Sequence, residues 1–297
     1  MTHEYVAELA GVRKCFGNVV ALDGFDLQVQ PGELLAVLGP NGAGKSTAIS
    51  LLLGLRQPEA GSARLFGLPP GQVEARRRIG VMMQEAALAA EIRIREHIEL
   101  VASYYPDPLP TDEVLTRTNL TPLADRPYGK LSGGQKRLAQ FAVAMCGRPA
   151  LFFLDEPTVG LDVQGRATMW AVLRQLVHDG CSIVLTTHYL EEADALADRV
   201  VVLAKGKTVA SGTVGEMRAT VSRKHVTCST SLAADLVAGW PGVQSVSHDR
   251  GRLAITTSDS DALVKRLINA DSGVTGLEVR SAGLAEAFTE LTQEVAS

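Results

Sequence analysis

Cysteine and long apolar runs are both scarce in this chain. Its 297 residues include 4 cysteines, with no CxxC pair and no histidine at ligand spacing. The sequence therefore predicts neither a disulfide framework nor a zinc site, and we expect buried thiols. No apolar run approaches the roughly 18 residues of a membrane-spanning helix, so we do not expect the chain to cross a bilayer by itself.

Basic charge is not in excess. The 29 lysines and arginines face 33 aspartates and glutamates, which gives a net charge of -4. A polyanion does not attract such a chain as a whole, and this weighs against a primary nucleic-acid binder. The opening residues, MTHEYVAELA, have acids where a secretory signal has a basic region and a long apolar core, so we expect a cytoplasmic protein.

The pattern up to about residue 212 indicates an α/β fold. Short apolar runs alternate with helical patterns, which is typical of βα units around a mostly parallel sheet. The clearest buried strands are 34–38, 151–154 and 183–186. Between 83 and 149 helical periodicity takes over, which predicts a helical insertion, and residues 200–210 read as a hairpin.

The C-terminal part follows a different order. A helix over 214–221 precedes elements in the order βαββαβ, with strands at 226–229, 243–247, 252–257 and 274–280 and helices at 231–238 and 260–270. This order predicts a small ferredoxin-like α+β domain, followed by a last helix from 283 to about 292. We therefore expect one domain over 1–221, with its helical subdomain at about 85–149, and a second over 222–297.

A glycine-rich loop follows the first buried strand and precedes a helical run over 48–55. Its glycines let backbone N–H groups point inward, and the helix places its positive end at the same spot, so a triphosphate fits there. Lys45 is predicted to meet the β and γ phosphates and Ser46 to ligate magnesium. A chance match has odds of about one in a hundred. The loop is Gly39, Pro40, Asn41, Gly42, Ala43, Gly44, Lys45, Ser46 and Thr47.

Two carboxylates end the strand at 151–154. Asp155 can give the nucleotide's metal a second contact, and Glu156 is a candidate base that polarises the attacking water. Alone, such a pair is often only a cap of the strand. Together with the glycine-rich loop it indicates nucleotide hydrolysis.

A second phosphate site is indicated at residues 131–137. The segment opens an apolar-periodic helix, which by itself would be an ordinary helix start. It offers a hydroxyl, bare backbone amides and a helix N-terminus, which together suit a phosphate. The residues are Ser132, Gly133, Gly134 and Gln135.

GPNGAGKST, LSGGQ and LFFLDEP, in this order and at these separations, resemble the nucleotide-binding subunit of an ATP-binding cassette (ABC) transporter. The resemblance covers residues 5 to about 220, and LSGGQ is its most specific element. It implies that the LSGGQ of one subunit closes over the ATP held by the glycine-rich loop of another, so that two copies bind two ATP with Mg²⁺.

The resemblance also assigns roles to isolated residues. Gln84 falls at the position of the Q-loop glutamine, which touches metal and water, and His188 at that of the switch histidine, which contacts the γ phosphate. Asp162 falls in the D-loop, which bears on the dimer contact. Phe16 stands where the family usually has a tyrosine that stacks on adenine, and simple packing is an equally good explanation of this residue.

The chain has one glycine-rich loop and one LSGGQ, which in the resembling family is half of the ATP-hydrolysing unit. The resemblance therefore implies a homodimer on the cytoplasmic face of a membrane, held there by membrane-spanning permease subunits that dock on residues 86–103. The wording of DEPTVGLD, THYLEEA and LAEAF is similar to bacterial multidrug and antibiotic exporter cassettes. The alternative is a regulatory or ribosome-associated cassette ATPase without a membrane partner.

Overall fold

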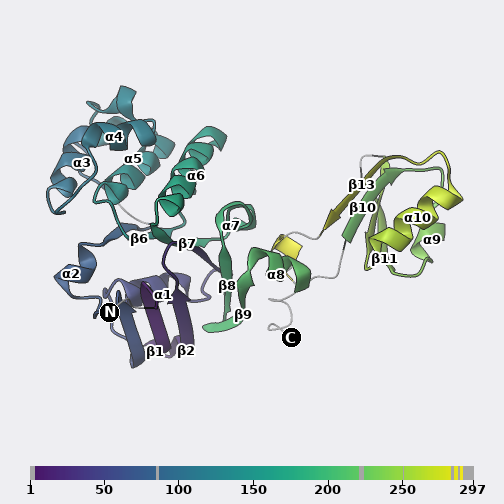
Figure 1. Ribbon diagram of the computed structural model, residues 1–297, viewed down its shortest axis with the longest axis horizontal. Coiled ribbons are helices and arrows are strands. Elements are labelled where there is room, and N and C mark those ends of the chain that lie inside the picture. The colour runs from purple at the N-terminus through teal and green to yellow at the C-terminus, as the bar shows by residue number, and fades with distance from the viewer. Residues whose placement is uncertain are drawn as a thin grey trace. The chain divides into compact units, whose positions relative to one another are not determined.

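The computed structural model describes residues 4–84, 87–220, 224–249, 251–281, 284–286 and 288–289. The chain has two compact units, Met1–Thr213 and Val214–Ser297 (Figure 1). Each is described by itself below.

A six-stranded sheet organises the first unit. The strand order is β5-β6-β7-β3-β8-β9, and every neighbouring pair is parallel except the hairpin of β8 and β9. The three buried strands and the hairpin predicted from the sequence are confirmed. The strands are β3 (Leu34–Leu38), β5 (Ile79–Met82), β6 (Leu151–Asp155), β7 (Ser182–Thr187), β8 (Arg199–Ala204) and β9 (Lys207–Thr213).

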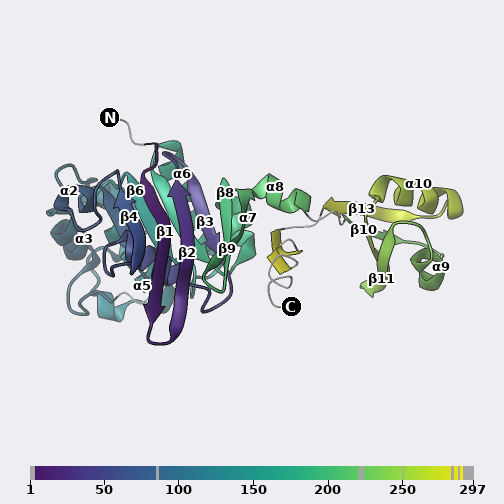
Figure 2. The same cartoon turned by 90° about the horizontal axis from the view of Figure 1, so that it is seen from below.

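The first unit also contains an antiparallel sheet that was not predicted. It has the order β2-β1-β4, from β1 (Ala7–Phe16), β2 (Val19–Val29) and β4 (Ala60–Leu65) (Figure 2). The expectation of βα units from the start of the chain was wrong for these residues. Register shifts interrupt the pairing of β1 with β2. Residues 25–29 of β2 nevertheless alternate between buried and exposed positions, which is a strand signal that was overlooked.

The helices of the first unit lie on both sides of the six-stranded sheet. The expected helical insertion is confirmed, and Figure 1 shows α3, α4 and α5 grouped together. The helix predicted over 48–55 begins three residues earlier, at Lys45. The bounds are α1 (Lys45–Leu52), α2 (Val73–Arg76), α3 (Ile94–Ala102), α4 (Thr111–Arg117), α5 (Gly133–Met145), α6 (Val163–His178) and α7 (Leu190–Leu196), with short 3-10 turns η1 (Thr121–Leu123) and η2 (Tyr128–Lys130).

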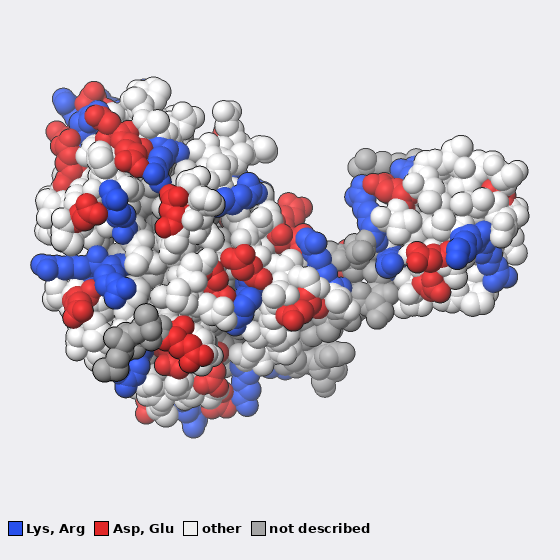
Figure 3. Space-filling model, viewed as in Figure 1, with Lys and Arg blue, Asp and Glu red and all other residues white. Residues whose placement is uncertain are grey.

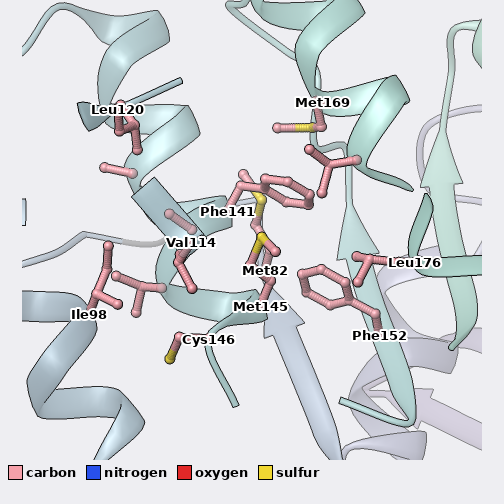
Figure 4. Close-up of a cluster of buried hydrophobic side chains, with 14 of the residues drawn as sticks. Met82, Ile98, Val114, Leu120, Phe141, Met145, Cys146, Phe152, Met169 and Leu176 are labelled. Atoms are coloured by element: carbon pink, nitrogen blue, oxygen red, sulfur yellow. The ribbon is translucent and has the colours of Figure 1, made fainter. Parts of the chain in front are cut away.

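Alternate residues of the central strands feed two separate cores, because side chains along a strand point to opposite faces. On one face, Phe152 packs with α5 and α6 in what we call the signature-side core, and the rings of Phe141 and Phe152 stack 5.6 Å apart. Figure 4 shows Met82, Phe141 and Met145 at its centre. On the other face, Phe153 packs with α1 and the antiparallel sheet in the P-loop-side core. Helices α1 and α5 therefore cover opposite faces of the sheet.

The second unit has the element order predicted from the sequence. After α8 (Val214–Thr220), the order is β10 (Lys224–Ser229), α9 (Ala234–Ala238), β11 (Val243–Asp249), β12 (Arg252–Thr257), α10 (Ser260–Ala270) and β13 (Thr275–Ser281). The four strands pair antiparallel in the order β11-β12-β10-β13. Helix α9 starts three residues later than expected. The last predicted helix lies partly outside the described residues.

The expectations about the cysteines and about membrane-spanning helices can be compared with the structure. Cys146, Cys181 and Cys228 are buried free thiols as expected, whereas Cys15 is only half-buried. Burial raises the pKa of Cys146 and Cys181 to about 12, so both thiols stay protonated. Across the described residues, each helix is too short or too polar to cross a membrane.

Candidate functional site

The glycine-rich loop joins β3 to α1 and surrounds the ammonium group of Lys45. The Lys45 Nζ donates to the carbonyl oxygens of Gly39 at 2.7 Å and Pro40 at 3.2 Å. Gly44 has φ +113°, and a Cβ there would lie 2.6 Å from the Ala21 carbonyl oxygen, so only glycine fits. The loop thus holds a cation at the N-terminus of a helix, which is the environment that a phosphate needs.

Lys45 is buried, and burial lowers its pKa, although the nearby Glu156 and Asp155 oppose that shift. The charged ammonium is costly in this position unless an anion approaches it. A bound phosphate would supply that anion. The loop residues predicted from the sequence therefore form one cradle in the structure.

Ser46 and Asp155, two of the three predicted metal ligands, are brought together although 109 residues separate them in the sequence. The Ser46 Oγ donates to Asp155 Oδ2 at 3.1 Å, and the Thr186 hydroxyl donates to the other carboxylate oxygen. Hydroxyl and carboxylate oxygens are hard donors of the kind that Mg²⁺ takes. The described residues contain no group of three carboxylate, thiol or imidazole ligands. Such a pair suits Mg²⁺, which is usually held by one or two protein groups together with phosphates and water.

Glu156 follows Asp155 in a conformation that few residues adopt. Its φ is +52°, and its backbone N–H donates to the carbonyl oxygen of Thr186 at 3.0 Å. Such a backbone costs about 1–3 kcal/mol and persists where the surroundings enforce it, often at functional sites. Its carboxylate is buried, and Oε2 lies 2.6 Å from Nδ1 of His188. The strand ends of β6 and β7 thus place the predicted base beside the predicted switch histidine.

His188 is half-exposed, in contrast to the buried Glu156. Its ring lies 4.2 Å from the ring of Tyr189, centroid to centroid. The carboxylate therefore holds one ring nitrogen while the rest of the imidazole is open to a ligand. A carboxylate that orients an imidazole in this way suits proton transfer at a bound phosphate.

The LSGGQ segment forms the N-terminus of α5. Ser132 Oγ accepts from the Gln135 backbone N–H at 3.3 Å, and Gln135 Oε1 accepts from the Ser132 N–H at 3.0 Å. This reciprocal pair is a capping box, in which the side chains satisfy two amides at the helix start. Ser132 and Gly133 are exposed, and no acidic residue lies in the first turn. An anion can approach this helix end from outside.

Asp162 lies beside the LSGGQ segment. Its Oδ1 accepts from the Gly165 N–H at 2.7 Å and so caps α6. A cavity of about 300 Å³ is shared by Asp162, Ser132, Gly134 and Gln135. The structure thus places the predicted D-loop residue against the predicted signature.

Phe16, at the end of β1, is 40% exposed, which leaves its ring available for stacking. The Arg56 guanidinium lies 4.8 Å from the ring centroid, and the Lys14 Nζ lies 5.8 Å from it. Glu59 fixes the segment, because its carboxylate accepts from Lys14 Nζ at 2.7 Å and from the Cys15 N–H at 2.6 Å. The Lys14 hydrogen bond lowers the pKa of Glu59.

Gln84 follows β5 and is exposed, and its carbonyl oxygen accepts from Arg137 at 3.1 Å. The position of its side chain relative to the metal ligands stays a prediction. The adjoining Glu85 and Ala86 lie outside the described residues.

An apolar cavity of about 480 Å³ opens between the helical insertion and the core. Helix α3, which contributes to it, starts only at Ile94 because Glu96 Oε2 accepts from the Arg93 N–H at 2.8 Å and caps it there. The apolar lining residues are Leu53, Leu55, Ile79, Val81, Met82, Met83, Leu88, Val101, Val143 and Ala144.

Three residues at the site were missed in the sequence. Thr186 holds Asp155, as described above. Glu192 is buried in α7, where its Oε1 accepts from Trp170 Nε1 at 3.1 Å, and burial raises its pKa. Arg137 is buried on the face of α5 that also carries Phe141 and Met145, and a charged residue on an apolar helical face is a signal that could have been noticed.

Charge on the visible surface is mixed. Figure 3 shows basic and acidic side chains interspersed over the first unit on the face drawn. This distribution differs from the basic stripe that is typical of nucleic-acid binders.

Comparisons with known proteins agree with the geometry. The family model described as ABC transporter matches residues 22–159. The daunorubicin resistance ATP-binding protein DrrA3 of Streptomyces coeruleorubidus is 36% identical over 298 residues, covering 95% of this chain and 94% of its own. The Nod factor export ATP-binding protein I of Burkholderia thailandensis is 42% identical over 210 residues, covering 68% of each chain.

Solved structures are similar in fold. The ATP-binding subunit of an ABC transporter superposes with a TM-score of 0.67 at 27% identity, covering 72% of this chain and 92% of that one. A dimeric post-hydrolysis cassette bound to ADP and Pi has a TM-score of 0.63 at 24% identity, covering 70% and 98%.

Proposed function

The chain belongs to the ABC transporter family as an ATP-binding subunit and an ATPase, and on this premise we propose that two copies enclose two ATP molecules and drive export. ATP closes the dimer, and hydrolysis opens it. Each nucleotide lies between the glycine-rich loop of one copy and the Ser132 helix end of the other. Permease subunits hold the pair on the cytoplasmic face of the membrane.

One observation carries this proposal. Helix α1 packs in the P-loop-side core and α5 in the signature-side core, on opposite faces of the same sheet. A chain built in this way presents two phosphate-binding helix ends in different places. A second copy related by a two-fold axis can complete both sites at once, because a two-fold contact pairs the same surface patches reciprocally.

The chemistry follows from the described contacts. Lys45 would bind the phosphates, while Ser46 and Asp155 would hold Mg²⁺, which when bound neutralises charge on the phosphate oxygens. Glu156 would take the proton of the attacking water, and His188, held through Nδ1, would contact the γ phosphate with its other ring nitrogen. Gln84 would contact the metal and the water from the end of β5, and Asp162 would meet the partner copy.

The base would be recognised by stacking. Phe16 presents an exposed ring beside Arg56, and an aromatic face of this kind contributes about 1 kcal/mol. Adenine is the base that the ATP assignment implies. The missing hydroxyl of a tyrosine does not change this stacking surface.

Export is favoured by the relatives, which are a daunorubicin resistance ATP-binding protein and a Nod factor export ATP-binding protein. The apolar cavity beside α3 would receive a short cytoplasmic segment of the permease. The second unit would be a ferredoxin-like module, since its first strand lies between the third and the fourth and the second lies at the edge. We place the functional boundary after residue 221.

Purification of the full chain from detergent-solubilised membranes tests the assignment to transport. The expected result is recovery with a polytopic membrane protein and MgATP turnover by the complex. Recovery with ribosomes and without a membrane protein would contradict it. A Val101→Asp variant, which places a charge in the cavity beside α3, should lose the membrane protein but keep ATP binding, whereas the exposed Arg174→Lys variant should keep both.

A further inference from the structure

Arg137 makes more hydrogen bonds than its place in the sequence suggests. Its guanidinium is buried, and it donates to the carbonyl oxygens of Glu156 at 2.7 Å, Asp155 at 3.0 Å and Pro157 at 3.0 Å. It also donates to the carbonyl oxygens of Met83 and Gln84, each at 3.1 Å. A sixth acceptor is Oε1 of Gln140, at 3.2 Å.

The six acceptors are neutral amide oxygens, so these bonds do not form an ion pair. Burying a cation among neutral groups is costly, and the cost is offset only where most of its N–H groups are satisfied with good geometry. Burial lowers the pKa of Arg137, and the nearby Asp155 opposes this. A planar fork of five donors suits this arrangement, and a lysine, with a single compact ammonium group, cannot reach both segments.

The two segments that Arg137 joins lie at the ends of neighbouring parallel strands. Met83 and Gln84 follow β5, and the carbonyls of residues 155–157 follow β6. The second segment carries Glu156, whose positive φ depends on support from its surroundings. Arg137 thus fixes the backbone of the proposed base and of the Q-loop with one side chain.

Arg137 itself belongs to the helix that begins at the signature. It lies five residues after Ser132, within the second turn of α5. A shift of the helix end against a neighbouring copy would move the guanidinium, and through it the carbonyls of Glu156 and Gln84. The connection runs through one rigid helix and five short hydrogen bonds.

We propose that Arg137 is a positioning residue that links the two ATP sites of the dimer. It ties the base and the Q-loop of one site to the signature that covers the nucleotide of the other. This inference rests on the proposed function, since it needs two composite sites. To the proposed function it adds a residue, Arg137, through which the nucleotide state of one ATP site changes the rate of hydrolysis at the other.

Mixed dimers of the full chain are made by co-expressing two differently tagged copies. They separate the effect of Arg137 on Glu156 of its own copy from its effect on the signature that covers the other site. The reference pairs one Lys45→Met copy with one wild-type copy, which leaves a single complete site. In the first arrangement Arg137→Lys is in the copy that supplies Glu156 to that site. In the second it is in the Lys45→Met copy, which supplies only the signature. Turnover is normalised to bound nucleotide, so a loss of folded protein does not count.

Both arrangements should fall about 10- to 100-fold below the reference in kcat, because small misplacements of positioning groups have effects of that size. Nucleotide affinity should change by less than about 3-fold, since Arg137 donates only to the protein chain. A matched Arg174→Lys substitution on the exposed face of α6 should leave the reference rate unchanged.

Reference-level turnover in either arrangement would overturn the link. A lower kcat in the first arrangement alone means that Arg137 positions only Glu156 of its own copy. A lower kcat in the second alone means that Arg137 supports only the signature helix. A lower melting temperature with unchanged kcat in both would make Arg137 structural and would also overturn the inference. If the reference dimer itself does not hydrolyse ATP, the proposed function fails, which is a different result.

Discussion

The glycine-rich loop and the LSGGQ helix end can be compared directly, because in the proposed function each presents a helix N-terminus to a phosphate. In the loop, the cation is buried and already held by the chain's own carbonyls. At the LSGGQ segment, the helix end is exposed and capped only by Ser132 and Gln135. The first site is thus shaped to bind nucleotide alone. In the proposed function the second acts only when another copy brings a nucleotide to it.

The largest effect should come from removing the base. Glu156→Gln keeps the size of the side chain but cannot accept a proton, so turnover should fall by roughly 10² to 10⁴ while ATP binding persists. The closed dimer should accumulate, which size-exclusion chromatography with MgATP measures. Normal turnover by this variant would show that another group is the base.

One substitution at each helix end tests whether the two ends have different roles. Lys45→Met should weaken ATP binding by about 100-fold or more, because the phosphates lose their buried cation. Ser132→Arg should leave the affinity of the monomer unchanged and lower turnover about 100-fold, since it blocks the exposed helix end. Isothermal titration and a phosphate-release assay separate the two results. Equal loss of affinity in both variants would contradict the division of roles.

A smaller effect is expected at the base-stacking position. Phe16→Ala should raise the dissociation constant for ATP about 5-fold, which corresponds to about 1 kcal/mol of stacking, and should leave kcat unchanged. Phe16→Tyr is the matched control and should bind as the wild type does. An unchanged affinity in Phe16→Ala would assign this ring to packing.

The smallest effect concerns the second unit at acid pH. Asp271 accepts from the hydroxyl of Thr230, the N–H and hydroxyl of Ser231 and the N–H of Gly273. These bonds, with that of Thr230 the strongest, hold the pKa of Asp271 well below its usual range. A depressed pKa in the folded state adds stability that is complete above the ordinary aspartate pKa of about 3.9 and is lost as the pH falls below it.

The melting temperature of the second unit should therefore fall between about pH 5 and pH 2 by more in the parent chain than in Asp271→Asn. The chain has 2 tryptophans, so in a Trp170→Phe background the fluorescence of Trp240 reports on this unit. Identical acid profiles for the two proteins would show that the turn at Asp271 does not contribute.

The parts of the fold that the sequence predicted are those with local signals. Strand β3 and the loop after it could be read directly, because five consecutive apolar residues lead into glycines at fixed spacing. The antiparallel sheet was missed, although β1 and β2 form a hairpin in which Phe16 pairs with Val19. Register shifts interrupt its pairing, and β4 lies far from β1 in the sequence. The βαββαβ order of the second unit was predictable because helical patterns separate most of its strands and β12 alternates between buried and half-buried positions, although a register shift interrupts β11.

The same distinction applies to the site. Lys45, Ser46 and Glu156 belong to motifs and could be named in advance. Arg137 could be noticed as a charged residue on an apolar helical face, but its role could not be predicted, because its five backbone acceptors lie 18 to 54 residues away in the chain and meet only in the folded unit. The motif that ends at Gln135 predicts a surface for phosphate. Arg137, two positions later, is the residue that we propose connects this surface to the base.

Mixing the Lys45→Met and Ser132→Arg variants tests most directly whether two copies build each site. Each variant alone should be nearly inactive. In a mixed dimer the first supplies an intact Ser132 helix end and the second an intact loop, so an equal mixture should recover up to roughly a quarter of the wild-type turnover, as two-fold pairing requires. A mixture that stays inactive while both variants fold and bind as expected would contradict the account, as would turnover by a strictly monomeric wild-type chain.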